Sequence, residues 1–255
     1  MRLKLLVLYL ALLLCAGTSH ANEAQSLRIF STESKPLAFM NEGRPDGFMV
    51  ELMHALQDRI GRHDALEIVP WARATMLAEA GPNAMLLFVA RTPERERNLQ
   101  FIGPVFSTQL TAFALKGKAA EWRRQKLDFQ QLRGGARRGT IFATQARAQG
   151  FNVIEEASNA EIAAKMLING RFDLWFDAEE LMADTVRSAG YDPDQLEVAF
   201  RRPGQSIYIA FSKGVPQAVV RTWNEALSAM KRDGSFLKIH RKWLPSSQLP
   251  LDVKP

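Results

Sequence analysis

The most chemically informative stretch of this sequence is residues 91–97, where three arginines and two glutamates share seven positions. A guanidinium presents a planar set of N–H donors that can bind both oxygens of a carboxylate at once. The preceding Pro-Glu pair predicts that Arg95 lies in the first turn of a helix, directly after an apolar strand at residues 84–90. An anion is favoured at this place, because the N–H groups of a first helical turn have no partner within the helix.

The other arginines of this stretch have a simpler interpretation. Exposed arginines usually pair with neighbouring acids, and such pairs contribute little. We therefore interpret Arg91 and Arg97 as surface residues. The same alternative stays open for Arg95, with Glu94, Glu96 or another acid as its partner.

A second candidate is the carboxylate of Asp177, which follows the apolar residues 174–176 and precedes an expected helix. A carboxylate at the C-terminal end of a strand is well placed to meet a cationic group at the edge of a sheet. Aspartate is also a common N-cap. The sequence therefore leaves open whether Asp177 binds a ligand, caps the helix or does both.

Trp71 and Arg73 form a third candidate pair, at the end of an expected strand at residues 65–71. Residues two apart point to the same side of a strand. The indole could then stack on a flat ligand or a cation, while the guanidinium binds a second anion. The alternative is that Trp71 belongs to the core and Arg73 is solvated. Glu33, in the first loop, is a further candidate for the site.

The sequence offers little for catalysis or metal binding. It contains no GxSxG or HExxH motif, and its only cysteine, Cys15, lies in the expected leader. His54, His63 and His240 are far apart, and we interpret them as surface or core residues. We expect neither a metal nor another cofactor.

Residues 1–21 have the features of a signal peptide, which predicts export to the periplasm. A basic start precedes an apolar run at residues 5–14, which is too short to span a bilayer, and small residues end the segment. A lipoprotein signal ending at Cys15 is the alternative, but such a signal requires a small residue at the position of Leu14.

Cleavage after the signal peptide lowers the formal charge of the chain from +6 to +4. So mild an excess, in an exported protein, argues against a nucleic-acid partner.

The apolar pattern of the remaining chain predicts two successive blocks of alternating strands and helices, as in mixed sheets with crossover helices. A helix at residues 48–60 has apolar residues at helical spacing and ends at Gly61. The run at residues 84–90 is apolar throughout, which indicates a strand buried on both faces. Two late strands are expected at residues 196–200 and 206–214, and two helices end the chain.

Five stretches, taken in order, resemble bacterial extracellular solute-binding proteins of family 3, the periplasmic polar amino-acid-binding proteins of ABC transporters. They are DGFMVELMHAL, RTPERERNLQFIGPVF, RRGTIFATQA, LINGRFDLWFDAEEL and DGSFLKIHRKWL. The resemblance implies a periplasmic-binding-protein-like type II fold, in which two mixed α/β lobes are joined by two hinge strands and bind ligand between them. Lobe 1 would comprise residues 22–108 and 207–255, and lobe 2 residues 109–206, with hinges near residues 108–113 and 205–210.

The resemblance also implies roles for single residues. Arg95 matches the arginine that binds the α-carboxylate of the ligand, and Asp177 matches the carboxylate that binds its ammonium group. Residues 139–142 match a loop whose N–H groups help to hold the same carboxylate, and Arg137 ends the strand before it. The first three residues of this loop are Gly139, Thr140 and Ile141.

The sequence departs from the family pattern in the wall of the pocket. Ile141 stands where a small glycine is common, and residues 88–90 read FVA where a glycine and a hydroxyl residue are usual. Ser34 stands where an aromatic residue often stacks on the ligand. Trp71 and Arg73 could compensate. We therefore expect a small organic anion or an amino-acid-like zwitterion as the ligand.

The resemblance favours a monomeric binding protein, not an enzyme, that captures a small ligand with a carboxylate for an inner-membrane ABC permease. One alternative is a ligand-binding partner of a sensor receptor. The other is an enzyme of the same fold, similar to periplasmic cyclohexadienyl dehydratases. Its acid would have to come from Glu33, Asp177 or Glu179.

Overall fold

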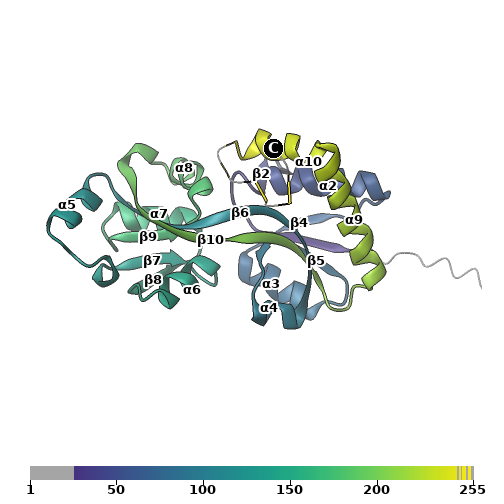
Figure 1. Cartoon of the computed structure of the whole chain (residues 1–255), viewed down its shortest axis with the longest axis horizontal. Helices are drawn as coiled ribbons and strands as arrows, with labels where there is room; N and C mark the ends of the chain where they lie inside the picture. The colour runs from purple at the N-terminus through teal and green to yellow at the C-terminus, as the bar shows by residue number, and fades with distance from the viewer. Residues whose placement is uncertain (1–25, 246, 248, 251, 254–255) are drawn as a thin grey trace, which may run out of the picture.

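The computed structural model describes residues 26–245, 247, 249–250 and 252–253, so the expected signal peptide lies outside the described residues. The described chain forms two α/β lobes along the long axis of the molecule, joined by two long strands (Figure 1). Lobe 1 contains both ends of the described chain, and lobe 2 contains its middle. The chain therefore crosses from one lobe to the other twice.

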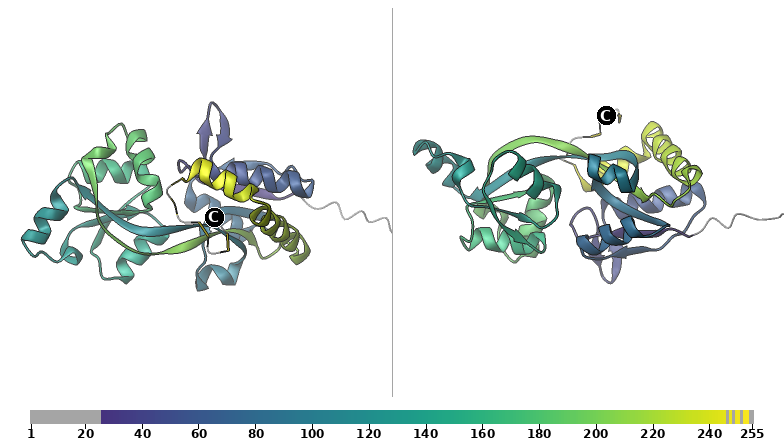
Figure 2. Two further views of the ribbon diagram at one scale, coloured as in Figure 1. Left: turned by 45° about the horizontal axis from the view of Figure 1, so that its top comes forward. Right: turned by 90° about the horizontal axis from the view of Figure 1, so that it is seen from below.

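One mixed sheet runs through both lobes. Its strands are β1 (Arg28–Ser31), β4 (Leu66–Ile68), β5 (Ala84–Ala90), β6 (Leu99–Leu115), β7 (Gly134–Arg137), β8 (Val153–Ala157), β9 (Leu174–Asp177) and β10 (Leu196–Ser212). Their order in the sheet is β4-β1-β5-β10-β6-β9-β7-β8. In lobe 1 β1 pairs in parallel with β4 and β5, and in lobe 2 β7 pairs in parallel with β8 and β9. A separate hairpin of β2 (Phe39–Asn41) and β3 (Arg44–Asp46) projects from lobe 1 (Figure 2).

β6 and β10 connect the two lobes. They pair with each other antiparallel along most of their length. β10 also pairs with β5 of lobe 1, whereas β6 also pairs with β9 of lobe 2. In the view from below, both strands run along one side of the two lobes (Figure 2). The lobe boundaries expected at residues 108 and 206 fall within these two strands.

Helices flank the sheet in each lobe. Those of lobe 1 are α2 (Phe48–Ile60), α3 (Trp71–Ala80), α4 (Pro93–Asn98), α9 (Gln217–Asp233) and α10 (Ser235–Trp243). Those of lobe 2 are α5 (Lys118–Arg124), α6 (Ile141–Ala148), α7 (Ala160–Ile168) and α8 (Glu179–Ser188), with 3₁₀ turns at Phe129–Gln131 and Pro193–Gln195. In lobe 1, α2, α9 and α10 pack together on one side of the sheet, and α3 and α4 lie on the other (Figure 1).

Local sequence explains where α2 ends and where α4 begins. Gly61 follows α2 with a φ of 68°, a left-handed conformation that glycine adopts without steric strain. Thr92 is the N-cap of α4, and its Oγ1 accepts the N–H of Arg95 at 3.3 Å. Pro93 follows at a position where its missing N–H costs no helical hydrogen bond. This cap holds the first turn of α4, and therefore Arg95, at the end of β5.

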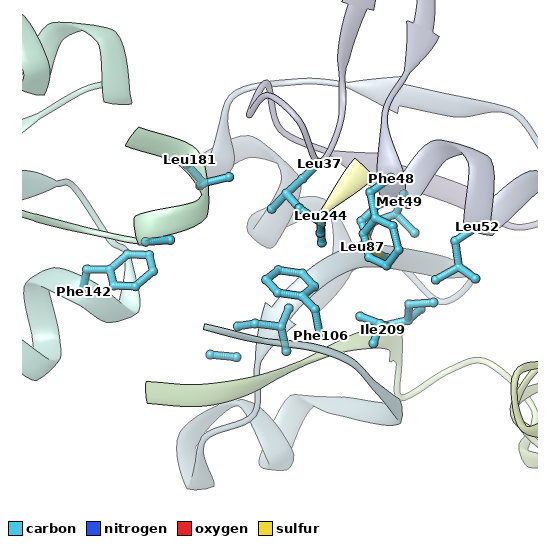
Figure 3. Packing of buried hydrophobic residues seen from close by; sticks show 14 of the residues in the cluster. Leu37, Phe48, Met49, Leu52, Leu87, Phe106, Phe142, Leu181, Ile209 and Leu244 are labelled. Atoms are coloured by element: carbon cyan, nitrogen blue, oxygen red, sulfur yellow. The ribbon is translucent and has the colours of Figure 1, made fainter. Parts of the chain in front are cut away.

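The largest apolar cluster includes side chains of both lobes. It extends from Phe48 and Leu52 of α2, through Phe106 of β6, to Phe142 and Leu181 of lobe 2 (Figure 3). Burying one such side chain contributes roughly 1.5–3 kcal/mol relative to leaving it exposed. Packing on this scale holds the strand ends of each lobe in fixed positions.

The expected α/β fold of two mixed lobes joined by two strands is confirmed. α2 and β5 also have the predicted bounds. Trp71 begins α3 instead of ending a strand, because Pro70 takes the N-cap position and the chain turns into the helix there. Residues 196–200 and most of 206–214 form one strand, because β6 pairs with both parts and a register shift between them absorbs the intervening residues. The β2–β3 hairpin and α5 were not expected from the sequence.

Candidate ligand-binding site

A cavity of about 550 Å³, which we call the interlobe cavity, lies between the two lobes. Residues from lobe 1 in its wall include Glu33, Leu37, Trp71, Phe88, Arg95 and Phe106, and residues from lobe 2 include Arg137, Arg138, Thr140, Ile141, Phe142 and Leu181. Leu37 and Phe106 lie on the lobe 1 side, and Phe142 and Leu181 lie opposite them (Figure 3). Pockets of this size hold small molecules.

Arg95 is the strongest candidate for an anion-binding group in this cavity. Its Nη1 donates to the carbonyl oxygen of Ala90 at 3.0 Å, and its Cζ lies 5.5 Å from the ring centroid of Trp71. Within the described part of the chain, no carboxylate forms an ion pair with it. Burial lowers the pKa of this guanidinium from its usual value, and the charges of Glu79 and Glu94 act in the opposite direction, but an arginine stays protonated at neutral pH. Arg95 is therefore a half-buried cation with free donors.

The neighbouring arginines behave as surface residues. Arg91 forms an ion pair with Glu96, and both side chains are exposed. Arg97 is exposed as well and is not part of the cavity wall. Of the three arginines at residues 91–97, the structure directs Arg95 to the interlobe cavity.

Asp177 is paired with Arg137 at the ends of the adjacent parallel strands β9 and β7. Nε and Nη2 of Arg137 donate to the two carboxylate oxygens at 2.9 and 2.8 Å. The side chains of Arg137 and Asp177 are only 14% and 1% exposed. The carboxylate also accepts the N–H of Ala178, and Ala178 itself is the N-cap residue of α8. The carboxylate expected to meet a ligand ammonium group is therefore occupied by a guanidinium of the same lobe.

The loop at residues 139–142 opens onto the cavity and also contacts lobe 1. Gly139 has a φ of 69°, and its carbonyl oxygen accepts the indole N–H of Trp71 at 3.1 Å. Thr140 is the N-cap residue of α6, and its Oγ1 donates to the carbonyl oxygen of Arg137 at 2.8 Å. Ile141 begins α6 and lines the cavity. The indole hydrogen bond therefore bridges the two lobes beside the cavity.

Trp71 and Arg73 do not share a face, contrary to the expectation. Both lie in the first turn of α3, where residues two apart point about 200° away from each other. Trp71 lines the cavity, whereas Arg73 is exposed and is not part of its wall. The expectation is wrong because it assumed a strand. Glu33 lines the cavity from an exposed position, and its Oε1 accepts the N–H of Met40 at 3.2 Å.

Several wall residues had not been singled out as ligand contacts from the sequence. Phe88 lies where the β5–β10 register shifts, and its φ of 26° is rare for a bulky side chain. Phe106 and Thr108 enter the wall from β6, and Arg138 enters it with a side chain that is 74% exposed. In the sequence, an apolar strand residue that faces a cavity cannot be distinguished from one that faces a core. The only signal that could have identified Phe88 as a wall residue is its position shortly before Arg95.

Nothing in the described residues indicates a metal site, since no group of three or more His, Cys, Asp or Glu side chains gathers there. Over the same part of the chain, no helix has the length and apolarity needed to cross a membrane.

Two α/β lobes joined by a pair of long strands, with a cavity between them, define the class of periplasmic-binding-protein folds. The chain belongs to the family of bacterial extracellular solute-binding proteins, family 3, whose model matches residues 27–246. The resemblance found in the sequence is thereby confirmed.

Curated relatives of this chain are amino-acid-binding proteins. An amino-acid-binding protein of Dichelobacter nodosus is 24% identical over 219 residues, which is 84% of this chain and 85% of the relative. A probable histidine-binding protein of Campylobacter jejuni is 21% identical over 238 residues, which is 89% of this chain and 88% of the relative.

Solved structures with the same fold are distant in sequence. A histidine kinase sensor domain with similarity to periplasmic binding proteins has a TM-score of 0.78 at 18% identity, over 90% of this chain and all of that domain. A His/Glu/Gln/Arg/opine-family binding protein from Silicibacter pomeroyi, in complex with lysine, has a TM-score of 0.76 at 20% identity, over 88% of this chain and all of that protein. An ancestral amino-acid-binding protein described as a precursor of cyclohexadienyl dehydratase has a TM-score of 0.71 at 21% identity, over 86% of this chain and 94% of that protein.

Proposed function

We propose that this protein is a periplasmic solute-binding protein that captures a small ligand with a carboxylate in the interlobe cavity and delivers it to an ABC permease. The observation that carries the proposal is the half-buried guanidinium of Arg95 in the cavity wall, which has no carboxylate partner among the described residues. A carboxylate bound to it gains charge-assisted hydrogen bonds that are stronger than neutral ones. The family and its amino-acid-binding relatives support a ligand of this kind.

Ligand capture in this cavity requires contacts with both lobes. The wall combines Arg95 and Trp71 of lobe 1 with Thr140 and Ile141 of lobe 2. A ligand that touches both walls binds the closed arrangement of the lobes better than an open one. It therefore shifts the population toward closure without any chemical step.

A thermal-shift screen of amino acids and small carboxylates, followed by calorimetry on the hits, tests the proposal. A ligand that binds only the folded state stabilises it by about 2.7 kcal/mol at a hundred times its dissociation constant. We expect at least one carboxylate to raise the melting temperature in this way. A flat response across amino acids, monocarboxylates and dicarboxylates would contradict the proposal.

We propose binding and not catalysis, because each acid considered for a dehydratase has a partner. Asp177 is paired with Arg137, and Glu179 forms a bidentate ion pair with the exposed Arg201 at 2.5 and 2.6 Å. Glu33 is exposed and bound to a backbone N–H. Incubation with prephenate or arogenate, followed by absorbance, should show no ring aromatisation. Ring aromatisation by the natural chain that is lost when Glu33, Asp177 or Glu179 is replaced would establish an enzyme instead.

Glu180 of α8 is a further acid near the connecting strands, and its pKa is raised above 4.5. Burial is the main cause, and the charges of Glu179 and Asp177 add to it. Hydrogen bonds to the carboxylate, one of them from Thr108, act in the opposite direction. Its Oε2 accepts the hydroxyl of Thr108 at 3.3 Å, so it ties α8 to β6. Glu180 is not part of the cavity wall. Its shifted ionisation therefore supports a structural role beside the connecting strands, not an acid that reaches a ligand.

Delivery to a permease is the part of the proposal that requires an experiment in living cells. Deleting the gene should abolish uptake of the ligand identified by calorimetry. A role as a sensor partner predicts unchanged uptake and a lost transcriptional response to the same ligand. We expect the protein to act as a monomer, which light scattering after gel filtration would check.

A further inference from the structure

We propose that the ligand of the interlobe cavity is a carboxylate with an apolar body and no ammonium group beside the carboxylate. This inference rests on the proposed function and narrows its ligand class. Three features of the cavity in the described structure lead to it: an unpaired cation, the lack of a free buried anion, and a wall that is largely aromatic and aliphatic.

The positive charge available to a ligand lies mainly on Arg95. Arg137 also lines the cavity, but two of its nitrogens are engaged by Asp177. Arg138 lies at the exposed edge, with its Nε 3.9 Å from a carboxylate oxygen of Glu156. A carboxylate that enters the cavity therefore meets the guanidinium of Arg95 as its inner partner.

Among the described residues of the cavity wall, no buried carboxylate offers an ammonium group an equivalent partner. Asp177 is almost fully buried, and both of its oxygens accept hydrogen bonds from Arg137. To bind an ammonium group there, the ligand would have to separate this pair and leave the guanidinium of Arg137 without its counter-charge. Breaking a buried ion pair by withdrawing one partner is strongly unfavourable.

The carboxylates that line the wall, Glu33 and Glu161, lie toward its exposed edge. Glu33 is exposed, and its Oε1 accepts the N–H of Met40. Glu161 is partly exposed in the first turn of α7, next to the exposed residues Ser158 and Asn159. Water and salt weaken the attraction between such exposed groups and an ammonium ion. These carboxylates therefore cannot replace a buried ammonium site.

Most of the wall between these charged groups is apolar. Lobe 1 contributes Phe88, Phe106 and Ile207, and lobe 2 contributes Phe142 and Leu181. Figure 3 shows Phe106 on one side and Phe142 and Leu181 on the other. Aromatic side chains of this kind gain most when they cover an apolar or aromatic surface. A polar ligand body would lose hydrogen bonds to water here and regain few of them from the wall.

A pair of probes that differ only in the α-ammonium group tests the inference: 3-phenylpropanoate and L-phenylalanine. By calorimetry, we expect 3-phenylpropanoate to bind at least tenfold more tightly. Equal or tighter binding of L-phenylalanine, or no binding of either probe, would overturn the inference. The proposed function is judged separately by the wider screen. A polar amino acid that binds through Arg95 would preserve the proposed function while removing this narrower ligand class.

A variant tests whether the occupied Asp177 is the cause. Arg137→Gln frees the carboxylate, so the affinity for L-phenylalanine relative to 3-phenylpropanoate should rise at least tenfold. The matched control is Arg133→Gln, because Arg133 forms the same bidentate pair with Asp173, at 3.0 and 2.8 Å, at the other ends of β7 and β9.

The control variant should leave the ratio of the two affinities unchanged. A ratio that Arg137→Gln does not move would contradict the role given to Asp177 and overturn the inference. If the Arg137 variant does not fold, the comparison of the two probes on the natural chain still decides the outcome.

Discussion

At the scale of single residues, the proposed site depends on one guanidinium that has no carboxylate partner in the described part of the chain. Arg95 is held by its own backbone cap at Thr92 and by the carbonyl oxygen of Ala90, so its direction is set before any ligand arrives. Preorganisation of this kind reduces the entropy lost on binding.

Arg95→Gln should therefore lower the affinity for the ligand found by screening by at least a hundredfold. The substitution removes the positive charge and the planar pair of donors but keeps a side chain that fits a helix. Calorimetry measures the effect, and Arg97→Gln, an exposed neighbour on the same helix, is the control. Similar affinities for the two variants would remove Arg95 from the site.

Phe88 makes a second prediction at this scale, because its φ of 26° suits glycine better than any other residue. Within strands, glycine is normally about 0.5–1 kcal/mol less favourable than alanine. At position 88 we expect this order to be reversed, so that Phe88→Gly is at least as stable as Phe88→Ala in urea unfolding.

The matched comparison is Leu87→Gly against Leu87→Ala, at a fully buried neighbour without a positive φ. Alanine should be the more stable of these two variants. The usual order at both positions would show that Phe88 is not strained.

At the scale of elements, the helix α10 carries a buried histidine that couples its packing to pH. His240 is 1% exposed and lies edge-on to Phe48 of α2, at 5.5 Å between ring centroids. Burial, with a smaller effect of Arg241, lowers the pKa of His240 to about 4. The unfolded chain, with a pKa near 6.5, takes up this proton first as the pH falls.

Stability should therefore decrease as the pH falls from about 6.5 to about 4, by at most roughly 3 kcal/mol from this group. Above this window the contribution of His240 is constant. Urea unfolding at several pH values, compared between the natural chain and His240→Gln, isolates the effect. His54→Gln, which changes an exposed histidine of α2, serves as the control. Parallel pH profiles for the natural chain and the His240 variant would contradict the prediction.

At the scale of the whole molecule, the lobes meet beside the interlobe cavity through a hydrogen bond. The indole N–H of Trp71 in lobe 1 donates to the carbonyl oxygen of Gly139 in lobe 2 at 3.1 Å. Trp71 also faces Arg95. The same side chain thus belongs to the cavity wall and to the contact between the lobes.

Trp71→Phe keeps an aromatic ring beside Arg95 but removes the N–H donor. A net loss of about 0.5–1.5 kcal/mol corresponds to roughly a 2- to 12-fold weaker affinity for the identified ligand. Trp243→Phe is the control, because its indole donates to Glu51 within lobe 1 and does not line the cavity. An equal effect of both substitutions on affinity would argue against the interlobe role of Trp71.

Closure of the lobes leads to a second expectation. Small-angle scattering should show that ligand binding reduces the radius of gyration of the protein.

The local pattern of the sequence determined much of the fold. The helical spacing of residues 48–60 and the apolar run at residues 84–90 predicted α2 and β5 with their observed bounds. Both signals arise within a few consecutive residues, because the periods of helix and strand are local properties of the chain. The position of Arg95, after a buried strand and inside a capped first turn, is readable for the same reason.

Tertiary structure alone decided which groups remain free for a ligand. Arg137 and Asp177 are 40 positions apart, and only the parallel pairing of β7 with β9 brings their side chains together. Trp71 and Gly139 meet only because two lobes close on each other. A sequence specifies which charges and rings the chain possesses, but the partners of these groups depend on distances between segments that are remote in the chain. The occupation of Asp177, and with it the predicted class of ligand, therefore emerges only from the folded molecule.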